Sequence, residues 1–130
     1  MKITLITPYF PYPTRGRYFG AERYNDNLAL SLKKLGNEVK VVTTYWNGRK
    51  RFEYYKGIQI LRVKDLGAIF KIFGPFDIFY YISFGLGVLR KKNFRFYCDS
   101  DVILLSTPIL LFSKFFRIKN IPTISITFHI

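Results

Sequence analysis

Apolar residues fall in short blocks whose spacing alternates between that of a strand and that of a helix. Lys2 to Thr7 is a β-branched, apolar run that ends at a proline-rich loop, which predicts a strand buried on both faces. In residues 21–35 the apolar positions recur every three or four residues, which predicts an amphipathic helix, and Gly36 follows as a terminator. The predicted apolar face comprises Ala21, Tyr24, Leu28, Leu32 and Leu35. The predicted polar face comprises Arg23, Asn25, Asp26, Asn27, Lys33 and Lys34.

Further apolar runs predict four more strands, in "NEVKVVTTY" (37–45), "GIQILRV" (57–63), "DVILLS" (101–106) and "PTISITFH" (122–129). Pro108 to Arg117 is expected to be a helix, and residues 45–57 a solvated loop between the second and third strands. Strands that alternate with helices need crossover connections. The sequence therefore predicts an α/β fold with a mostly parallel sheet, in a single domain over residues 1–130.

The aromatic-rich segment 65–97 is harder to interpret. We expect a helix from about Asp77 to Lys92, because an open sheet needs a cover at this point in the chain. Core packing is one explanation of its aromatic residues. The alternative is an interfacial patch in which aromatics enter lipid and a basic rim meets anionic head groups. The rim would consist of Arg90, Lys91, Lys92 and Arg95.

Charge and cysteine usage narrow the choice of partners. The chain has 21 Lys and Arg against 8 Asp and Glu, a formal charge of +13, which predicts attraction to phosphates, anionic lipid or nucleic acid. Cys98 is the only cysteine, so no disulfide forms within the chain, and we expect a cytoplasmic protein, with peripheral contact at the inner face of the membrane. Nucleic acid ranks last, because the aromatic and basic residues of 45–57 match no known reader motif.

The loop over residues 8–19 is the first candidate for chemistry. Ligands of open α/β sheets gather at the carboxyl ends of the strands, which is where this loop lies. Arg15 and Arg17 could add charged donors, and Gly16 and Gly20 permit close backbone approach to a phosphate or carboxylate at the start of the helix. The spacing does not fit the dinucleotide fingerprint or a P-loop.

Several features in order resemble a known family. The stretch "MKITLITPYFPYP…GRYFGAERYNDNLALSLKKLGNEVKVVTT", followed by "GIQILRV", "DSDVILLSTP" and "IPTISITFH", is similar to the N-terminal domain of GT-B glycosyltransferases, in particular the retaining family 4. The resemblance implies a Rossmann-like three-layer sandwich with a mostly parallel sheet, here incomplete. It also implies that this domain faces the acceptor.

The resemblance implies a set of site residues. Gly20, Ala21 and Glu22 would belong to the loop that faces the sugar-nucleotide diphosphate and the acceptor, although Glu22 is equally explained as a helix-dipole partner. Thr107 would contact substrate, and His129 would line the cleft near the transferred sugar as the catalytic candidate. Two departures matter: Phe19 replaces the first glycine of the usual pair, and Asn37 replaces a common histidine.

Family 4 enzymes hold the nucleotide-sugar mainly in a second, C-terminal domain, which this sequence does not contain. We therefore expect the chain not to catalyse transfer alone, with the nucleotide-sugar as a substrate, a lipid-linked or cell-surface glycan as acceptor, no tightly bound cofactor and no required metal. One histidine and one cysteine make a zinc site implausible. The alternative function is a non-catalytic basic module that binds a membrane surface or a partner.

Overall fold

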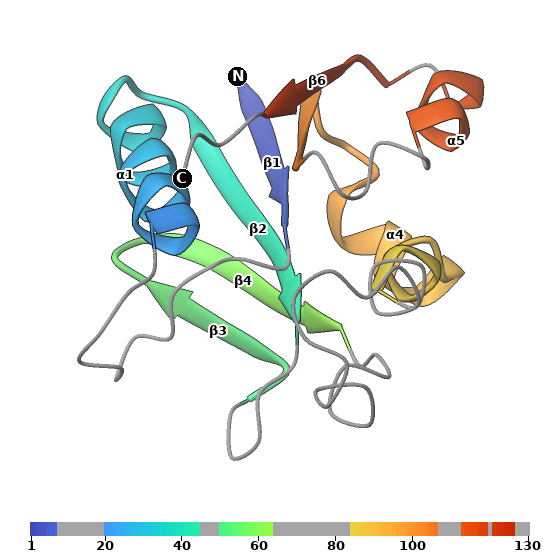
Figure 1. The fold of residues 1–130 in the computed structure, drawn as a ribbon, viewed down its shortest axis with the longest axis horizontal. Coiled ribbons are helices and arrows are strands. Elements are labelled where there is room, and N and C mark those ends of the chain that lie inside the picture. Colours follow the sequence, from blue (N-terminus) through green and yellow to red (C-terminus); the bar gives the residue numbers. More distant parts are fainter. Residues whose placement is uncertain (8–19, 45–49, 64–83, 107–112, 120, 127–130) are drawn as a thin grey trace.

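The computed structural model describes residues 1–7, 20–44, 50–63, 84–106, 113–119 and 121–126 (Figure 1). The strands are β1 (Lys2–Ile6), β2 (Glu38–Thr44), β3 (Phe52–Tyr55), β4 (Ile58–Val63), β5 (Val102–Ser106) and β6 (Thr123–Ile126). The helices are α1 (Gly20–Lys34), α4 (Lys91–Tyr97) and α5 (Ser113–Ile118), and residues 84–88 are also helical.

The described strands form one six-stranded sheet in the order β3-β4-β2-β1-β5-β6. β1 pairs in parallel with β2 and β5, and the parallel pairing continues outward to β4 and β6. Only β3 is antiparallel to its neighbour. The mostly parallel sheet and its crossover order confirm the predicted α/β, Rossmann-like fold.

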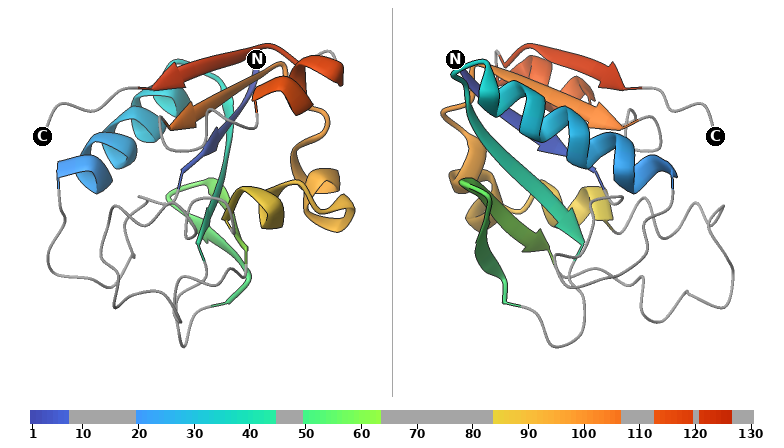
Figure 2. Two further views of the ribbon diagram at one scale, coloured as in Figure 1. Left: turned by 45° about the vertical axis from the view of Figure 1, so that its right-hand side comes forward. Right: turned by 90° about the vertical axis from the view of Figure 1, so that its left-hand side faces the viewer.

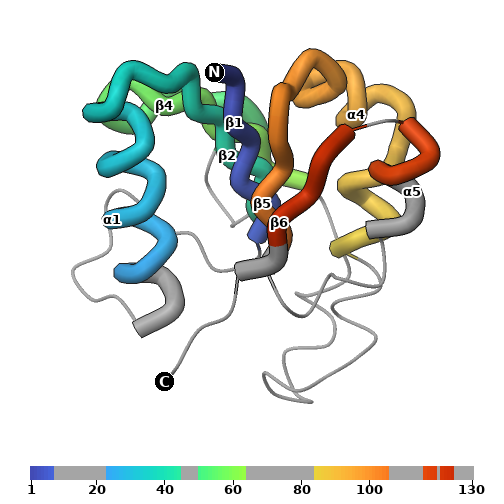
Figure 3. The backbone as a smooth tube through the Cα atoms, turned by 90° about the horizontal axis from the view of Figure 1, so that it is seen from above, coloured from blue at the N-terminus to red at the C-terminus, as the bar shows by residue number. Residues whose placement is uncertain are grey.

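Helices cover both faces of the sheet, and each face has its own apolar core (Figure 3). On one face α1 packs over alternate residues of the central strands, among them Leu5, Val41 and Ile60. On the other face the helical residues 84–88, α4 and α5 pack over Ile6, Val42 and their neighbours. Because β1 and β2 are covered on both faces, consecutive residues are buried along each strand, apart from the first residue of each and Lys40.

α1 runs antiparallel to β2, so its N-terminal end lies toward the carboxyl ends of the parallel strands (Figure 2, right). Its predicted polar face was partly wrong. Asn25 and Asp26 are buried, whereas Tyr24 and Leu35, expected in the core, are exposed. The buried face is centred on Asn25 and Ala29, about 100° from the predicted stripe, because the strand ends below it carry polar side chains that accept a polar helix residue.

The predicted end of α1 at Gly36 is confirmed. Gly36 has φ 92°, and its N–H donates to the carbonyl of Lys33. The Asn37 backbone N–H and its side-chain Nδ2 both donate to the carbonyl of Leu32. Asn37 thus closes the helix end that a histidine would occupy in the family pattern.

The predicted helix from Asp77 to Lys92 does not continue to its expected end. Residues 77–83 lie outside the described residues, residues 84–88 are helical, and the chain then turns before α4 begins at Lys91. Arg90 has ψ 138°, an extended conformation that stops the helix. Gly85 and Gly87 weaken helix formation here, and the carbonyl of Gly87 accepts the side-chain amide of Asn93.

The predicted loop 45–57 was wrong at its second half, which contains β3. Lys56 and Gly57 form a two-residue turn to β4 with φ 50° and 84°, the positive φ pair of a type I′ hairpin. A Cβ placed on Gly57 would lie 2.5 Å from Cε of Lys33 at the end of α1. The hairpin turn and the last turn of α1 are therefore in close contact.

A buried ion pair joins β3 to β4. Nη2 of Arg62 donates to Oε1 of Glu53 at 2.7 Å, and the Arg62 side chain is fully buried while that of Glu53 is 15% exposed. Removing one charge from such a pair leaves the other in a medium of low dielectric constant.

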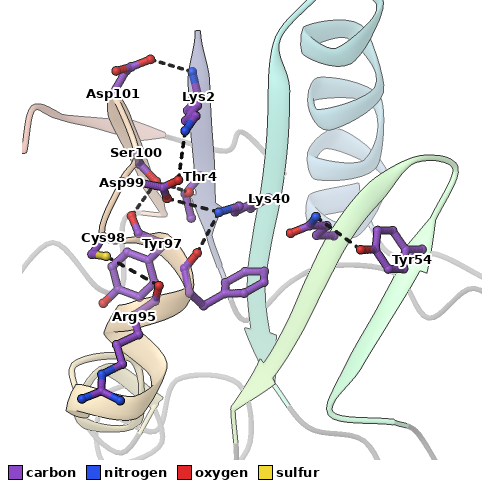
Figure 4. A network of polar contacts seen from close by, with 12 residues as sticks. Lys2, Thr4, Lys40, Tyr54, Arg95, Tyr97, Cys98, Asp99, Ser100 and Asp101 are labelled. Atoms are coloured by element: carbon purple, nitrogen blue, oxygen red, sulfur yellow. Dashed lines mark hydrogen bonds and ion pairs between the residues drawn. The ribbon is translucent and has the colours of Figure 1, made fainter.

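At the amino end of the sheet, a polar cluster ties β1 and β2 to the turn that follows α4 (Figure 4). Asp99 receives Nζ of both Lys2 and Lys40 at 3.2 Å, and Asp101 accepts the Lys2 backbone N–H at 2.7 Å. Thr4 and Ser100 are joined through their hydroxyls. Desolvation acts to raise the pKa of Asp99, but hydrogen bonds from Lys2 and Lys40 hold it below its usual value. The hydrogen bond to Asp99 raises the pKa of Lys2.

Substitution Glu53→Gln is expected to lower the free energy of unfolding by about 3 kcal/mol, because it removes the carboxylate charge that faces the buried Arg62 guanidinium. Urea denaturation measures this value. Glu38→Gln, at an exposed position, is the control and should change stability by less than about 0.5 kcal/mol. Equal effects of the two substitutions would contradict the buried pair.

Asp99→Asn is expected to lower stability at neutral pH, by at most about 1 kcal/mol because the side chain is half exposed. A depressed carboxyl pKa contributes stability above its unfolded value, and this contribution disappears as pH falls through the folded pKa. The difference between the two chains should therefore vanish in acid, as measured by urea denaturation at pH 7 and below pH 3. A difference that persists unchanged in acid would show that another interaction is responsible.

Candidate functional site

The parallel strands all end at one edge of the sheet, which we call the carboxyl edge. In open α/β sheets this edge is where loops and helix N-termini converge on a ligand. α1 begins at Gly20, and because it runs antiparallel to β2 its N-terminal half covers this edge.

Alternation of side chains places a polar row above the apolar core on the α1 face. Leu5, Val41 and Ile60 belong to the α1 core, so the next side chains on the same face are two residues further along each strand. The resulting buried group, here called the polar layer, comprises Thr7, Thr43 and Arg62 from the strands with Asn25 and Asp26 from α1.

Asn25 connects α1 to the end of β1. Its Nδ2 donates to Oγ1 of Thr7 at 3.1 Å, and the Thr7 backbone N–H donates to the Val42 carbonyl at 3.0 Å, which extends the β1–β2 ladder by one residue. Thr43 lies beside Arg62 in the β2–β4 register. The polar layer is thus held in place by backbone pairing below and by α1 above.

Asp26 lies on the side of α1 that faces β4. Residues 26, 30 and 33 share one side of a helix, and Lys33 on that side contacts Gly57 at the start of β4. Asp26 is about 10 Å further along the helix, toward the carboxyl edge, where β4 carries Arg62.

Oδ1 of Asp26 and Oγ1 of Thr43, both in the polar layer, are buried without a hydrogen bond. Asp26 is only 8% exposed and Thr43 is completely buried. Nearly all buried polar atoms in folded proteins are hydrogen-bonded, and each exception destabilises the fold by about 1–3 kcal/mol. The two atoms therefore mark a position where hydrogen bonding within the chain is incomplete.

The polar layer and the adjacent Glu53 together contain one basic side chain, Arg62, and two carboxyl side chains. Glu53 faces the guanidinium of Arg62, and Asp26 adds a further negative charge. Carboxylates and threonine hydroxyls are suited to accept or exchange hydrogen bonds with the hydroxyl groups of a polyol. In the described part of the chain, no group of three or more His, Cys, Asp and Glu side chains could hold a metal ion.

The sequence-predicted site residues divide into three groups. Arg15, Gly16, Arg17, Thr107 and His129 lie outside the described residues. Gly20, Ala21 and Glu22 form the first turn of α1 and so stand at the carboxyl edge, where the loop was expected to meet it.

All four residues of the predicted basic rim lie within the described residues. Arg90, Lys91, Lys92 and Arg95 are all exposed, at and just before α4, on the sheet face opposite α1. Among the described residues, no helix is both long enough and apolar enough to span a bilayer.

Comparison with known proteins supports the fold. Neither a protein-family model nor a curated protein matches the chain by sequence. A solved structure, sucrose-phosphate synthase from Thermosynechococcus elongatus, is similar over 97% of this chain, with a TM-score of 0.62 and 12% identity. The fold is glycosyltransferase-like. The chain spans 32% of the length of that synthase, and likeness at this identity establishes the fold and not membership of family 4.

Sequence reasoning missed the polar layer. Asn25 and Asp26 were assigned to solvent because Tyr24, Leu28 and Leu32 formed the more apolar stripe. A usable signal was Ala29, a small residue four positions after Asn25, since small residues permit close approach of a helix to a sheet. Arg62 carried no signal, because a lone cation within "GIQILRV" gives no indication of its partner.

Asp26→Leu and Asn25→Leu are expected to have opposite effects on stability. Asp26→Leu should raise the free energy of unfolding by about 1 kcal/mol, because it removes a buried carboxylate oxygen that makes no hydrogen bond. Asn25→Leu should lower it by about 1 kcal/mol, because the Thr7 hydroxyl loses its donor. Urea denaturation of both variants measures the difference. Destabilisation by Asp26→Leu of the same size as by Asn25→Leu would contradict this assignment.

Proposed function

We propose that this chain is the N-terminal, acceptor-side part of a retaining, family 4-type glycosyltransferase. The reaction moves a sugar from a nucleotide-sugar to a lipid-linked or cell-surface glycan acceptor. The bond from the anomeric carbon to the diphosphate breaks, a bond forms from that carbon to the acceptor oxygen, and the proton of the acceptor hydroxyl passes to the departing diphosphate. The donor is a substrate and not a resident cofactor, and we place the protein in the cytoplasm.

The single observation that supports this function is the polar layer at the carboxyl edge of a glycosyltransferase-like fold. Asp26 and Thr43 each carry a buried oxygen that lacks a hydrogen bond. Sugar hydroxyls are both donors and acceptors, and a carboxylate beside a hydroxyl is a common arrangement for fixing them. We therefore assign the polar layer to the saccharide side of the site.

The donor diphosphate needs positive charge. We assign this role to the backbone N–H groups at the N-terminal end of α1, over Gly20, Ala21 and Glu22, with Arg15, Gly16 and Arg17 of the preceding loop. Thr107 would contact the substrate, and His129 would line the cleft beside the transferred sugar; both roles rest on the family resemblance. A second domain would supply most of the nucleotide contacts, so the chain alone should transfer no sugar.

Binding of nucleotide-sugars and oligosaccharides to the 130-residue chain is expected in saturation-transfer NMR. Asp26→Asn and Thr43→Val should each weaken sugar binding, by about 10-fold if each removes one good hydrogen bond to the ligand. Both substitutions preserve side-chain shape. The dissociation constants of a matched panel of ligands provide the measurement.

Thr4→Val is the matched control, because Thr4 is equally buried but bonds Ser100 and belongs to the other face of the sheet. Weakening by Thr4→Val as large as by Thr43→Val would mean that stability, not contact, sets the effect. Failure of every nucleotide-sugar and glycan to bind would overturn the proposal. Once the chain is joined to a family 4 C-terminal domain, undiminished transfer by His129→Ala would remove His129 from the mechanism.

A further inference from the structure

Four exposed cations form a continuous group at α4, here called the cationic surface: Arg90, Lys91, Lys92 and Arg95. Lys2 and Lys40, by contrast, are paired with Asp99, and Arg62 is paired with Glu53. Within the described residues, no side chain of the cationic surface takes part in an ion pair or a side-chain hydrogen bond. Its charge is therefore directed to solvent.

The fold does not explain this concentration of charge. Lys91 and Arg95 are four residues apart and Lys92 and Arg95 three apart, spacings at which like charges destabilise a helix. α4 has no acidic residue in its first turn, and Arg90 makes no side-chain capping bond. Lys91 and Lys92 stand in the first turn of α4, where positive charge is unfavourable, so an external anion is the simpler reason for their presence.

α4 is held firmly, so the cationic surface is preformed. Nη2 of Arg51 donates to Oδ1 of Asn93 at 2.6 Å, and Nδ2 of Asn93 donates to the Gly87 carbonyl at 2.6 Å. The Tyr97 hydroxyl donates to the Val88 carbonyl at 2.9 Å, and burial raises the pKa of Tyr97, so this donor stays protonated. A fixed helix loses little conformational entropy when it binds.

The same contacts place the cationic surface near the carboxyl edge. The backbone carbonyl of Arg51 accepts the backbone N–H of Arg62 at 2.7 Å, next to the end of β4. The Arg51 side chain reaches Asn93 in the first turn of α4. Arg90, Lys91 and Lys92 therefore lie toward the edge at which the strands end. The polar layer occupies the α1 face at that same edge, and the cationic surface the opposite face.

Two apolar side chains are exposed near the cations. Leu86, in the helical residues 84–88, is 57% exposed, and Phe52, next to Arg51, is 55% exposed. Cations with apolar side chains beside them are the combination that binds the head-group and upper acyl region of an anionic bilayer.

The aromatic rings near α4 are poorly arranged to stack nucleic-acid bases. Phe96 packs against Phe52 with ring centroids 6.1 Å apart, and Nζ of Lys40 lies 5.3 Å from the Phe96 centroid. Phe94 packs against Tyr97 and receives Lys119 at 5.8 Å. Because stacking needs open ring faces, this arrangement favours lipid over single-stranded nucleic acid.

We propose that the cationic surface, with Leu86 and Phe52, docks this protein on an anionic lipid bilayer. The surface then holds the carboxyl edge next to the membrane, where a lipid-linked acceptor would be presented. The docking itself does not depend on the proposed sugar chemistry, so either proposal can fail while the other stands.

The test is flotation of the full 130-residue chain with phosphatidylcholine vesicles that contain 0 or 30% phosphatidylglycerol, at rising salt. Binding is expected only to the anionic vesicles and should weaken as salt rises. The double variant Lys91→Gln with Lys92→Gln should reduce the partition coefficient by roughly 30-fold, from the usual contribution of each basic residue near an anionic leaflet. Leu86→Ser should weaken binding with little change in its salt dependence.

The matched control is Arg23→Gln with Lys34→Gln, which removes the same charge from exposed positions of α1 on the other face of the sheet. This control should retain most of the binding. Equal losses in the two double variants would overturn the proposal, since net charge rather than the cationic surface would then explain binding. Absence of binding to anionic vesicles, or preference for a single-stranded oligonucleotide over them, would also overturn it. Nucleotide-sugar binding by Lys91→Gln with Lys92→Gln should be unchanged, which separates this test from that of the proposed function.

Discussion

Parallel pairing of β1 with both of its neighbours is the constraint on which the rest of the structure depends. Ile3 lies opposite Val39 on one side and opposite Val102 on the other, so strands separated by long stretches of sequence run in one direction and end together. Parallel neighbours must be joined by crossovers, and the crossovers supply a helical layer on each face. The shared direction gathers the polar layer at one edge and the Lys2–Lys40–Asp99 cluster at the other. One edge is thus closed by ion pairs, while the other retains incompletely bonded oxygens.

The polar layer lowers the stability of the fold, because it contains buried oxygen atoms that make no hydrogen bond. Two residues earlier on each strand, the same face carries Leu5, Val41 and Ile60 in a dry core. At the carboxyl edge, Asp26 and Thr43 instead carry buried oxygens that make no hydrogen bond. Sites that bind polar ligands commonly reduce stability in this way, because the groups that meet the ligand are not satisfied by the protein itself.

The five parallel strands and α1 could be predicted from the sequence. Apolar runs indicate strands and three-to-four spacing indicates a helix, whatever the tertiary contacts. It failed where a tertiary partner decides. Glu53 of β3 is partly buried because it pairs with Arg62, and neither residue indicates its partner in the sequence. The buried face of α1 lies one residue away from the predicted one. Asn25 is buried with a hydrogen bond to Thr7, whereas Tyr24, expected in the core, is exposed. The break before α4 depended on Asn93 reaching back to Gly87, a contact between residues that lie in different helical segments. The roles predicted for Arg15, Gly16, Arg17, Thr107 and His129 stay predictions, because these residues lie outside the described residues.

The contact of Gly57 with Lys33 joins the β3–β4 hairpin to the end of helix α1. Gly57 has a φ of 84°, and any side chain there would also meet the aliphatic end of Lys33. Because those atoms are the far end of a flexible side chain, Lys33 can move aside, and the positive φ is the stricter reason for glycine at position 57. The antiparallel margin of the sheet thus meets helix α1 through a contact that can adjust, whereas the turn itself depends on the backbone conformation of Gly57.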